Sequence, residues 1–178
     1  MNIGLLGFGV VGGGVWELAQ ENRALNVKKV LVRREAPSLG KAAVQDVEAI
    51  LRDTDIDTVV EVLGGLHPAY EWICRALAAG KDVVTANKAV ISAYYRELTA
   101  LARENGAALR CTAAVGGGIP WLVNLQRCRR VDTVTEVGGI MNGTTNFIMD
   151  AMARQGADFP AVLQRAQELG YAEADPSA

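Results

Sequence analysis

The sequence is poor in the residues from which metal centres and disulfide frameworks are built. Its 178 residues include one histidine, His67, and three cysteines, Cys74, Cys111 and Cys128. The cysteines are odd in number and widely spaced, with no C-x-x-C pair. We therefore expect neither a disulfide framework nor a zinc site, and the pattern fits a reducing cytoplasm. We interpret His67, before Pro68, as a local hydrogen-bonding residue and Cys111 as a small core residue.

Long apolar runs are also missing. No run reaches the roughly 18 residues that a membrane-spanning helix needs. The first residues lead directly into an expected strand, without a basic segment and a cleavage site. We therefore expect a soluble, cytoplasmic protein that does not associate with a membrane.

Neither sign of charge dominates. The 18 Lys and Arg residues against 20 Asp and Glu residues give a formal net charge of -2, which argues against nucleic acid as a partner. The local basic cluster of Arg127, Arg129 and Arg130 is better explained as the solvated end of a helix. Half of the sequence is apolar and 21% is charged, which is typical of a globular protein of one domain or a domain and a half.

What the sequence does contain is a regular alternation of β-rich and helical segments up to about residue 112. Helical spacing begins at Val11, and two later helices are expected, one ending before Gly80 and one capped by Ser92. This alternation predicts an α/β fold, a Rossmann-type doubly wound parallel sheet over residues 1–114. The expected strands are residues 2–6, 27–32, 58–62, 82–85 and 108–112, and the two later helices are residues 68–79 and 92–105.

The pattern changes after residue 114. Three glycines at 116–118 interrupt regular structure, and a short helix is expected from Pro120. Residues 133–137 alternate as a half-exposed strand does. Helices are expected at residues 145–154 and 159–169, the second ended by Gly170. We interpret residues 115–178 as the start of a second, α+β domain.

A glycine-rich turn follows the first expected strand and opens the first helix. It fits the pattern G-x-G-x-x-G in the strand–turn–helix context that supports dinucleotide binding. The first glycine permits the tight turn, the second lets a pyrophosphate approach the backbone, and the third lets the helix pack closely on the strand. Free N–H groups at the start of the helix then suit phosphate. The residues concerned are Gly7, Phe8, Gly9, Val10, Val11 and Gly12.

The end of the second strand favours NADP over NAD. Arg33 and Arg34 stand there, and a guanidinium group matches the geometry of the 2′-phosphate of NADP. Glu35 leaves NAD as an alternative cofactor, because an acidic residue at this point holds the ribose 2′-hydroxyl group of NAD. Two solvated arginines at a strand end are the alternative explanation. Leu63, Gly64 and Gly65 follow the third strand and are expected to line the nicotinamide or ribose pocket.

Four further blocks resemble the homoserine dehydrogenase family, and their order and spacing agree over essentially the whole chain. Residues 85–89 (TANKA) are similar to the loop after the family's fourth strand, and residues 113–120 (AAVGGGIP) to its loop between domains. Residues 139–147 (GIMNGTTNF) resemble its substrate-binding turn, and residues 170–176 (GYAEADP) its substrate-contacting loop. The resemblance implies NAD(P)-dependent interconversion of L-homoserine and L-aspartate 4-semialdehyde in threonine, methionine and isoleucine biosynthesis, and Arg33 and Arg34 favour NADP as the cofactor.

The resemblance also implies roles for individual residues. Lys88 is the expected catalytic residue, which handles the proton or polarises the substrate oxygen, and it is also expected to contact the cofactor. Glu173 would bind the ammonium group of the substrate. Asn142 and Thr145 are equally explained as helix caps, and Asp175 as part of an Asp-Pro turn. Gly143, Thr144 and Tyr171 are expected to bind substrate, and Gly170 to approach the cofactor.

In the family, main-chain carbonyl groups of the loop between domains hold a monovalent cation. The matching positions are Val115, Gly117 and Ile119, which would bind sodium. Thr112 stands where the family pattern has a glutamate, and this departure argues against a tightly held ion.

The resemblance further implies that the second domain mediates a homodimer and continues beyond residue 178 with a catalytic Asp and Lys. We therefore expect either a piece of a longer enzyme or the product of a shortened gene. Three hypotheses follow: homoserine dehydrogenase present as its N-terminal part, a non-catalytic NADP-binding fragment, or a dehydrogenase of a related amino-acid semialdehyde. The residues 142–146 (NGTTN) and Glu173 argue against the third.

Overall fold

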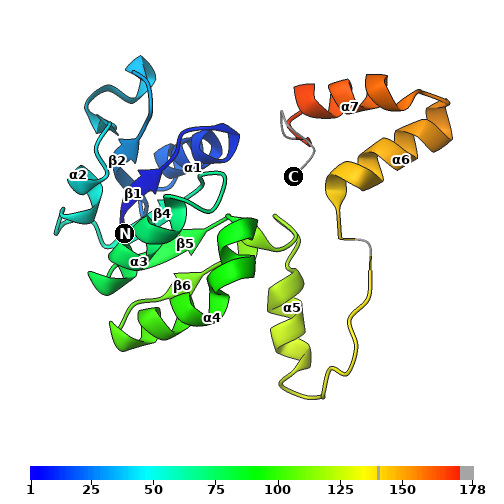
Figure 1. The fold of residues 1–178 in the computed structure, drawn as a ribbon. Helices are drawn as coiled ribbons and strands as arrows, with labels where there is room; N and C mark the ends of the chain where they lie inside the picture. The colour runs from blue at the N-terminus through cyan, green and yellow to red at the C-terminus, as the bar shows by residue number, and fades with distance from the viewer. Residues whose placement is uncertain (140, 173–178) are drawn as a thin grey trace. The chain divides into compact units, whose positions relative to one another are not determined.

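The computed structural model describes residues 1–139 and 141–172, and the chain divides into two compact units (Figure 1). The first unit comprises Met1–Arg130 and the second Val131–Ala178. The domain boundary expected between residues 114 and 115 stays a prediction.

A six-stranded parallel sheet organises the first unit. Its strand order is β3-β2-β1-β4-β5-β6, so the chain winds outward from β1 in both directions. This doubly wound order confirms the expected α/β, Rossmann-type fold, and it creates a crevice at the carboxyl ends of β1 and β4. The strands are β1 (Asn2–Leu6), β2 (Asn26–Leu31), β3 (Ala43–Val44), β4 (Thr58–Glu61), β5 (Asp82–Thr85) and β6 (Leu109–Arg110).

Apolar residues on both faces of the strands form two core clusters. Because successive side chains of a strand point to opposite faces, Leu5 and Val60 belong to one cluster while Leu6 and Val59 belong to the other. A strand covered on both sides therefore reads as a continuous apolar run, which is why these strands could be predicted. The buried Cys111 joins the second of these clusters, as expected.

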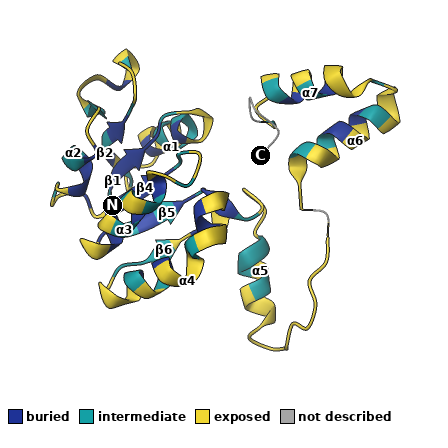
Figure 2. Cartoon of the chain, viewed as in Figure 1, coloured by how far each residue is buried: buried dark blue, intermediate teal, exposed yellow. Residues whose placement is uncertain are grey.

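Helices cover the two faces of the sheet (Figure 2). Buried residues of α2 (Glu48–Leu51), α3 (Ala69–Ala78) and α4 (Lys88–Glu104) pack in the cluster of Leu6, while α1 (Val10–Glu21) packs in the cluster of Leu5. A short helix, α5 (Trp121–Cys128), ends the first unit, and the arginines that follow its last turn are exposed, as expected. Two 3₁₀ helices complete the unit, η1 (Pro37–Ala42) and η2 (Thr112–Ala114).

The second unit contains the two expected helices, α6 (Gly143–Gln155) and α7 (Phe159–Glu168). They bury a small apolar cluster of Ile148, Ala151, Val162 and Ala166 between them. The side chain of Asn142 accepts a hydrogen bond of 2.9 Å from the main-chain N–H of Thr145, so Asn142 caps α6.

Two local predictions were wrong. The strand expected at residues 133–137 is absent, because a strand needs a hydrogen-bonded neighbour and residues 131–139 and 141–172 contain only helices and loops. Helix α4 begins at Lys88, not near Ser92, because the side chain of Asn87 accepts a hydrogen bond from the N–H of Val90 at 3.1 Å. The short elements η1, β3 and α2 were not anticipated.

Within residues 1–139 and 141–172, no helix is both long and apolar enough to cross a membrane.

Close packing of α1 on β1 depends on Gly12. A Cβ atom at Gly12 would lie 2.3 Å from the main-chain oxygen of Gly7, whereas a Cβ atom at Gly13 would meet nothing within 4 Å. We predict that Gly12→Ala lowers the free energy of unfolding by about 1–3 kcal/mol, because the helix must move away from the strand. Gly13→Ala should raise it by about 0.5–1 kcal/mol, because alanine favours the helix.

Thermal unfolding of both variants, measured without a dinucleotide, checks this prediction. For a chain of this length, each kcal/mol shifts Tm by roughly 2–4 °C. Equal stability of the Gly12 variant and the unsubstituted protein would contradict the packing argument, and Gly13→Ala controls for helix propensity alone.

Candidate dinucleotide and substrate site

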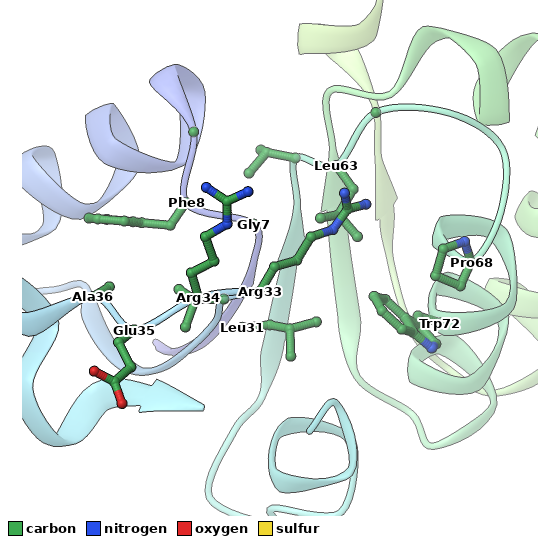
Figure 3. Close-up of a pocket in the computed structure, with 14 residues that line it drawn as sticks. Gly7, Phe8, Leu31, Arg33, Arg34, Glu35, Ala36, Leu63, Pro68 and Trp72 are labelled. Atoms are coloured by element: carbon green, nitrogen blue, oxygen red, sulfur yellow. The ribbon is translucent and has the colours of Figure 1, made fainter. Parts of the chain in front are cut away.

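A cavity of about 840 Å³ lies where the carboxyl ends of β1, β2 and β4 meet (Figure 3). Its walls come from segments that are far apart in the sequence: the turn after β1, the end of β2, the turn after β4, and α3. The predicted site residues that line it are Gly7, Phe8, Gly9, Arg33, Arg34, Leu63 and Gly64. Val10, Val11, Gly12, Gly65 and Lys88 are not among its lining residues.

The glycine turn has the geometry that a phosphate cradle requires. Gly7 has a φ of 106°, a conformation that residues with a side chain rarely adopt. A Cβ atom at Gly9 would meet nothing within 4 Å, so the backbone there is open to a ligand. The N–H groups of Val10, Val11 and Gly12 lie in the first turn of α1, where the helix itself offers no acceptor. A pyrophosphate fits these donors and the positive end of the helix dipole.

Arg33 and Arg34 supply the positive charge of the cavity. Both are exposed, and neither has an ion pair with another residue in the described part of the chain. Figure 3 shows the guanidinium group of Arg34 beside Phe8 and that of Arg33 directed toward Leu63, while the carboxylate of Glu35 points away from both. Two guanidinium groups without a carboxylate partner suit an anionic ligand.

Among the cavity-lining residues that sequence reasoning missed are Pro68 and Trp72. Pro68 precedes α3, and Trp72 lies in the first turns of that helix and is partly buried. Figure 3 shows them together on the wall opposite Phe8 and Ala36. A tryptophan soon after the turn that follows β4 is a usable signal, because the face of its ring suits a planar base.

A buried polar cluster lies beneath the turn after β4, at the ends of β4 and β5. The carboxylate of Glu61 is fully buried and accepts hydrogen bonds from Thr85 Oγ1 at 2.5 Å, Leu63 N at 2.7 Å and Asn87 Nδ2 at 3.4 Å. Burial raises the pKa of Glu61 above its ordinary value, and the hydrogen bonds from Thr85, Leu63 and Asn87 act in the opposite direction. Sequence reasoning included Glu61 only as a strand residue. A carboxylate directly after the apolar residues Val59 and Val60 of an expected buried strand was the available signal.

Lys88 is the first residue of α4 and follows the carboxyl end of β5 by three positions. Its side chain is exposed, and it forms no ion pair within the described residues. A cation at the N-terminus of a helix interacts unfavourably with the helix dipole. Helix stability therefore does not explain a lysine at this position.

Within the second unit, the structure brings two predicted substrate residues, Thr144 and Tyr171, together. The hydroxyl group of Thr144 donates a hydrogen bond to the main-chain carbonyl of Tyr171, and the ring of Tyr171 packs edge-on against Phe147 at 5.1 Å between centroids. Because that hydroxyl is already donating, the N–H groups of Gly143 and Thr144 are the donors left for an anion at the start of α6.

Glu173 and Asp175, which belong to the expected substrate-contacting loop of residues 170–176, lie outside the described residues. Gly170 has a φ of 76° and follows the end of α7, so its role as a helix stop is confirmed. A contact between Gly170 and a cofactor stays a prediction.

The loop expected to hold a cation supplies no charged ligand. Gly117 and Ile119 are exposed, and the carbonyl of Ile119 already accepts the N–H of Trp121 at 2.7 Å. The described residues include no group of three or more His, Cys, Asp or Glu side chains that could hold a metal ion. Whether the main-chain carbonyls of Val115, Gly117 and Ile119 hold a sodium ion stays a prediction.

His67 lies next to the cavity but has a local partner. Its Nδ1 atom is 2.6 Å from Oε1 of Glu71, four residues along the chain. This agrees with its interpretation as a local hydrogen-bonding residue.

Two protein-family models cover nearly all of the chain. The model described as the NAD binding domain of homoserine dehydrogenase matches residues 7–112, and the model described as homoserine dehydrogenase matches residues 120–178.

Individual proteins give the same result. Homoserine dehydrogenase of Synechocystis is 45% identical over 190 aligned positions, which cover 100% of this chain and 44% of that protein. The crystal structure of a homoserine dehydrogenase from Thiobacillus denitrificans matches with a TM-score of 0.88 at 39% identity, over 99% of this chain and 44% of that one. A hyperthermophilic archaeal homoserine dehydrogenase in complex with NADPH matches with a TM-score of 0.81 at 27% identity, over 99% and 63%. The chain thus spans less than half the length of the curated relative.

Proposed function

Because the chain belongs to the homoserine dehydrogenase family, we propose that it supplies the dinucleotide-binding part and the first substrate-binding segments of an NADP-dependent enzyme. The reaction interconverts L-homoserine and L-aspartate 4-semialdehyde. A homodimer built through the second domain and a sodium ion held by main-chain carbonyls of Val115, Gly117 and Ile119 are further parts of this proposal.

One observation carries the proposal: a single cavity joins the glycine turn of β1 and α1 to two arginines without carboxylate partners. The open backbone at Gly9 suits the pyrophosphate, and Arg33 and Arg34 suit a phosphate on the adenosine ribose. The archaeal relative in complex with NADPH supports the same cofactor.

Lys88 is the group that we assign to the substrate oxygen. The hydride of the reaction is exchanged with the nicotinamide ring of the bound dinucleotide. As the carbonyl of the semialdehyde becomes an alcohol, negative charge develops on its oxygen, and an ammonium group can stabilise that charge or donate the proton. The unfavourable position of Lys88 at the start of α4 is consistent with selection for chemistry.

The substrate's amino-acid end is assigned to the second unit. The free N–H groups of Gly143 and Thr144 and the dipole of α6 suit a carboxylate. Tyr171 is held beside them by its carbonyl and its ring. Glu173 follows Tyr171 by two residues and is proposed to bind the substrate ammonium group.

The direct test is the formation of NADPH from NADP and L-homoserine by this chain, followed by the absorbance of reduced nicotinamide. Turnover would establish the activity. Binding of NADPH without turnover would instead indicate a dinucleotide-binding part that needs further segments for catalysis, and turnover only with another amino-acid semialdehyde would contradict the proposed substrate.

The choice of cofactor gives a testable prediction. We expect Arg33→Ala and Arg34→Ala each to weaken NADPH binding by about 10- to 100-fold, because each removes a charge-assisted hydrogen bond to the 2′-phosphate. NADH lacks this phosphate, so its affinity should change by less than about threefold. Calorimetric titration with both dinucleotides measures the difference.

Arg23→Ala is the matched control, because Arg23 is exposed and lies beyond the other end of α1. If the Arg33 and Arg34 variants lose NADPH and NADH affinity equally, the arginines do not select the cofactor. If Glu35→Ala selectively weakens NADH binding, the protein is built for NAD.

The role of Lys88 gives a second prediction. We expect Lys88→Ala to lower kcat by about 10²- to 10⁴-fold, the range of general acid–base catalysis, while the Kd for NADPH changes little. The assay uses this chain if it turns over, and otherwise a fusion that adds the remaining length of the Synechocystis relative.

Lys88→Arg separates the two possible roles of the lysine. Arginine keeps the positive charge but does not release a proton near neutral pH, so a variant that stays active assigns Lys88 to charge stabilisation. Unchanged kcat in Lys88→Ala would remove Lys88 from the mechanism.

A further inference from the structure

Glu61 is a buried carboxylate that the chemistry above does not use. It is fully buried at the carboxyl end of β4, and it pairs with no cation among residues 1–139 and 141–172. Its neighbours in the strand, Val59 and Val60, are apolar core residues. Taking a carboxylate out of water carries a desolvation penalty, so fold stability alone does not explain a carboxylate here.

The partners of Glu61 come from two different turns. Leu63 belongs to the turn after β4, whereas Thr85 ends β5 and Asn87 immediately precedes Lys88. An ionised carboxylate only accepts hydrogen bonds, so it can take all three donors at once. Glu61 therefore connects the turn after β4 to the segment between β5 and α4.

Asn87 extends the connection in both directions. Its side-chain amide donates to the carbonyls of Gly65 at 2.8 Å and Leu63 at 3.3 Å, while its side-chain oxygen caps α4 at Val90. Its main-chain N–H donates to Thr85 Oγ1 at 3.0 Å. This set of contacts, which we call the Glu61 network, consists of Glu61, Leu63, Gly65, Thr85 and Asn87. It fixes the turn after β4 relative to the first residue of α4.

The strand order places this network under one half of the dinucleotide. Arg33 and Arg34 follow β2, on one side of β1, and the glycine turn that suits the pyrophosphate follows β1 itself. β4 and β5 lie on the other side of β1. A dinucleotide with its adenosine phosphate at β2 and its pyrophosphate at β1 extends its nicotinamide half over the ends of β4 and β5.

We propose that Glu61 is a positioning residue that shapes the nicotinamide half of the site. It also orients the start of α4, with Lys88, toward that half. The proposal rests on the proposed NADP-dependent function. The charge of Glu61 acts through the Leu63–Gly65 turn and Asn87, and the carboxylate itself touches neither substrate nor cofactor.

The test compares two ligands of the same cavity. NADPH spans both halves of the site, whereas 2′,5′-ADP represents the adenosine half alone. We expect Glu61→Gln, which keeps the size of the side chain but turns one acceptor into a donor, to weaken NADPH binding by about tenfold or more while the affinity for 2′,5′-ADP changes less than about twofold. Thr85→Val, which removes the hydroxyl donor from the other turn, should show the same selective loss.

Calorimetric titration and a thermal unfolding curve are recorded for each variant of the 178-residue chain. Asp82→Asn is the matched control, because Asp82 is a partly buried carboxylate at the opposite end of β5 that accepts the N–H of Ala108 at 2.9 Å. Retained binding of 2′,5′-ADP also shows that a variant is folded.

The possible outcomes separate the two proposals. Selective loss of NADPH affinity in Glu61→Gln and Thr85→Val, but not in Asp82→Asn, supports the positioning role. Unchanged NADPH affinity, or an equal loss of both ligands together with a lower Tm, overturns it. If the unsubstituted chain binds neither ligand, the proposed dinucleotide function fails first, and this inference fails with it.

Discussion

The contact between Gly12 and the carbonyl of Gly7 is the constraint on which the candidate site depends. Only a residue without a Cβ atom lets α1 approach β1 so closely, because a Cβ atom would lie 2.3 Å from that oxygen. The approach directs the first turn of α1, with its free N–H groups, at the edge of the sheet where β1 ends. A packing requirement inside the fold thus positions the candidate anion site at its surface.

Parallel strands bring the rest of the site to the same edge. Because all six strands run in one direction, their carboxyl ends coincide, and three of the following turns contribute different groups: main-chain N–H donors after β1, arginines after β2 and a glycine turn after β4. The apolar clusters on both faces hold the strands, while the buried Glu61 connects the turns after β4 and β5. Rigidity in this edge therefore comes from polar contacts, and rigidity in the sheet comes from apolar packing.

The second unit follows a simpler logic. Two amphipathic helices bury a small cluster, and capping by Asn142 leaves the N–H groups of Gly143 and Thr144 available at the start of α6. The contacts of Tyr171 with Thr144 and Phe147 bring the end of the described chain to the same helix terminus. Residues that are 27 positions apart in the sequence thereby contribute to one candidate substrate surface.

The sequence by itself determined the periodic elements, the glycine turn and the family resemblance, because each depends on spacing along a short stretch of chain. Buried parallel strands read as apolar runs, so β1, β4 and β5 were predictable, and Gly7 to Gly12 carry their pattern within six residues. Only the tertiary structure decided which distant residues meet: Trp72 and Pro68 as cavity walls, and Glu61 as the link between two turns. The cap of α4 is instead a local contact, from Asn87 to Val90, that the sequence analysis missed. The tertiary structure also decided against a strand at residues 133–137, whose alternation is local but whose hydrogen-bonded neighbour would have to come from elsewhere. Local periodicity depends on residues that are close in the sequence, whereas contacts between distant residues form only when the chain folds.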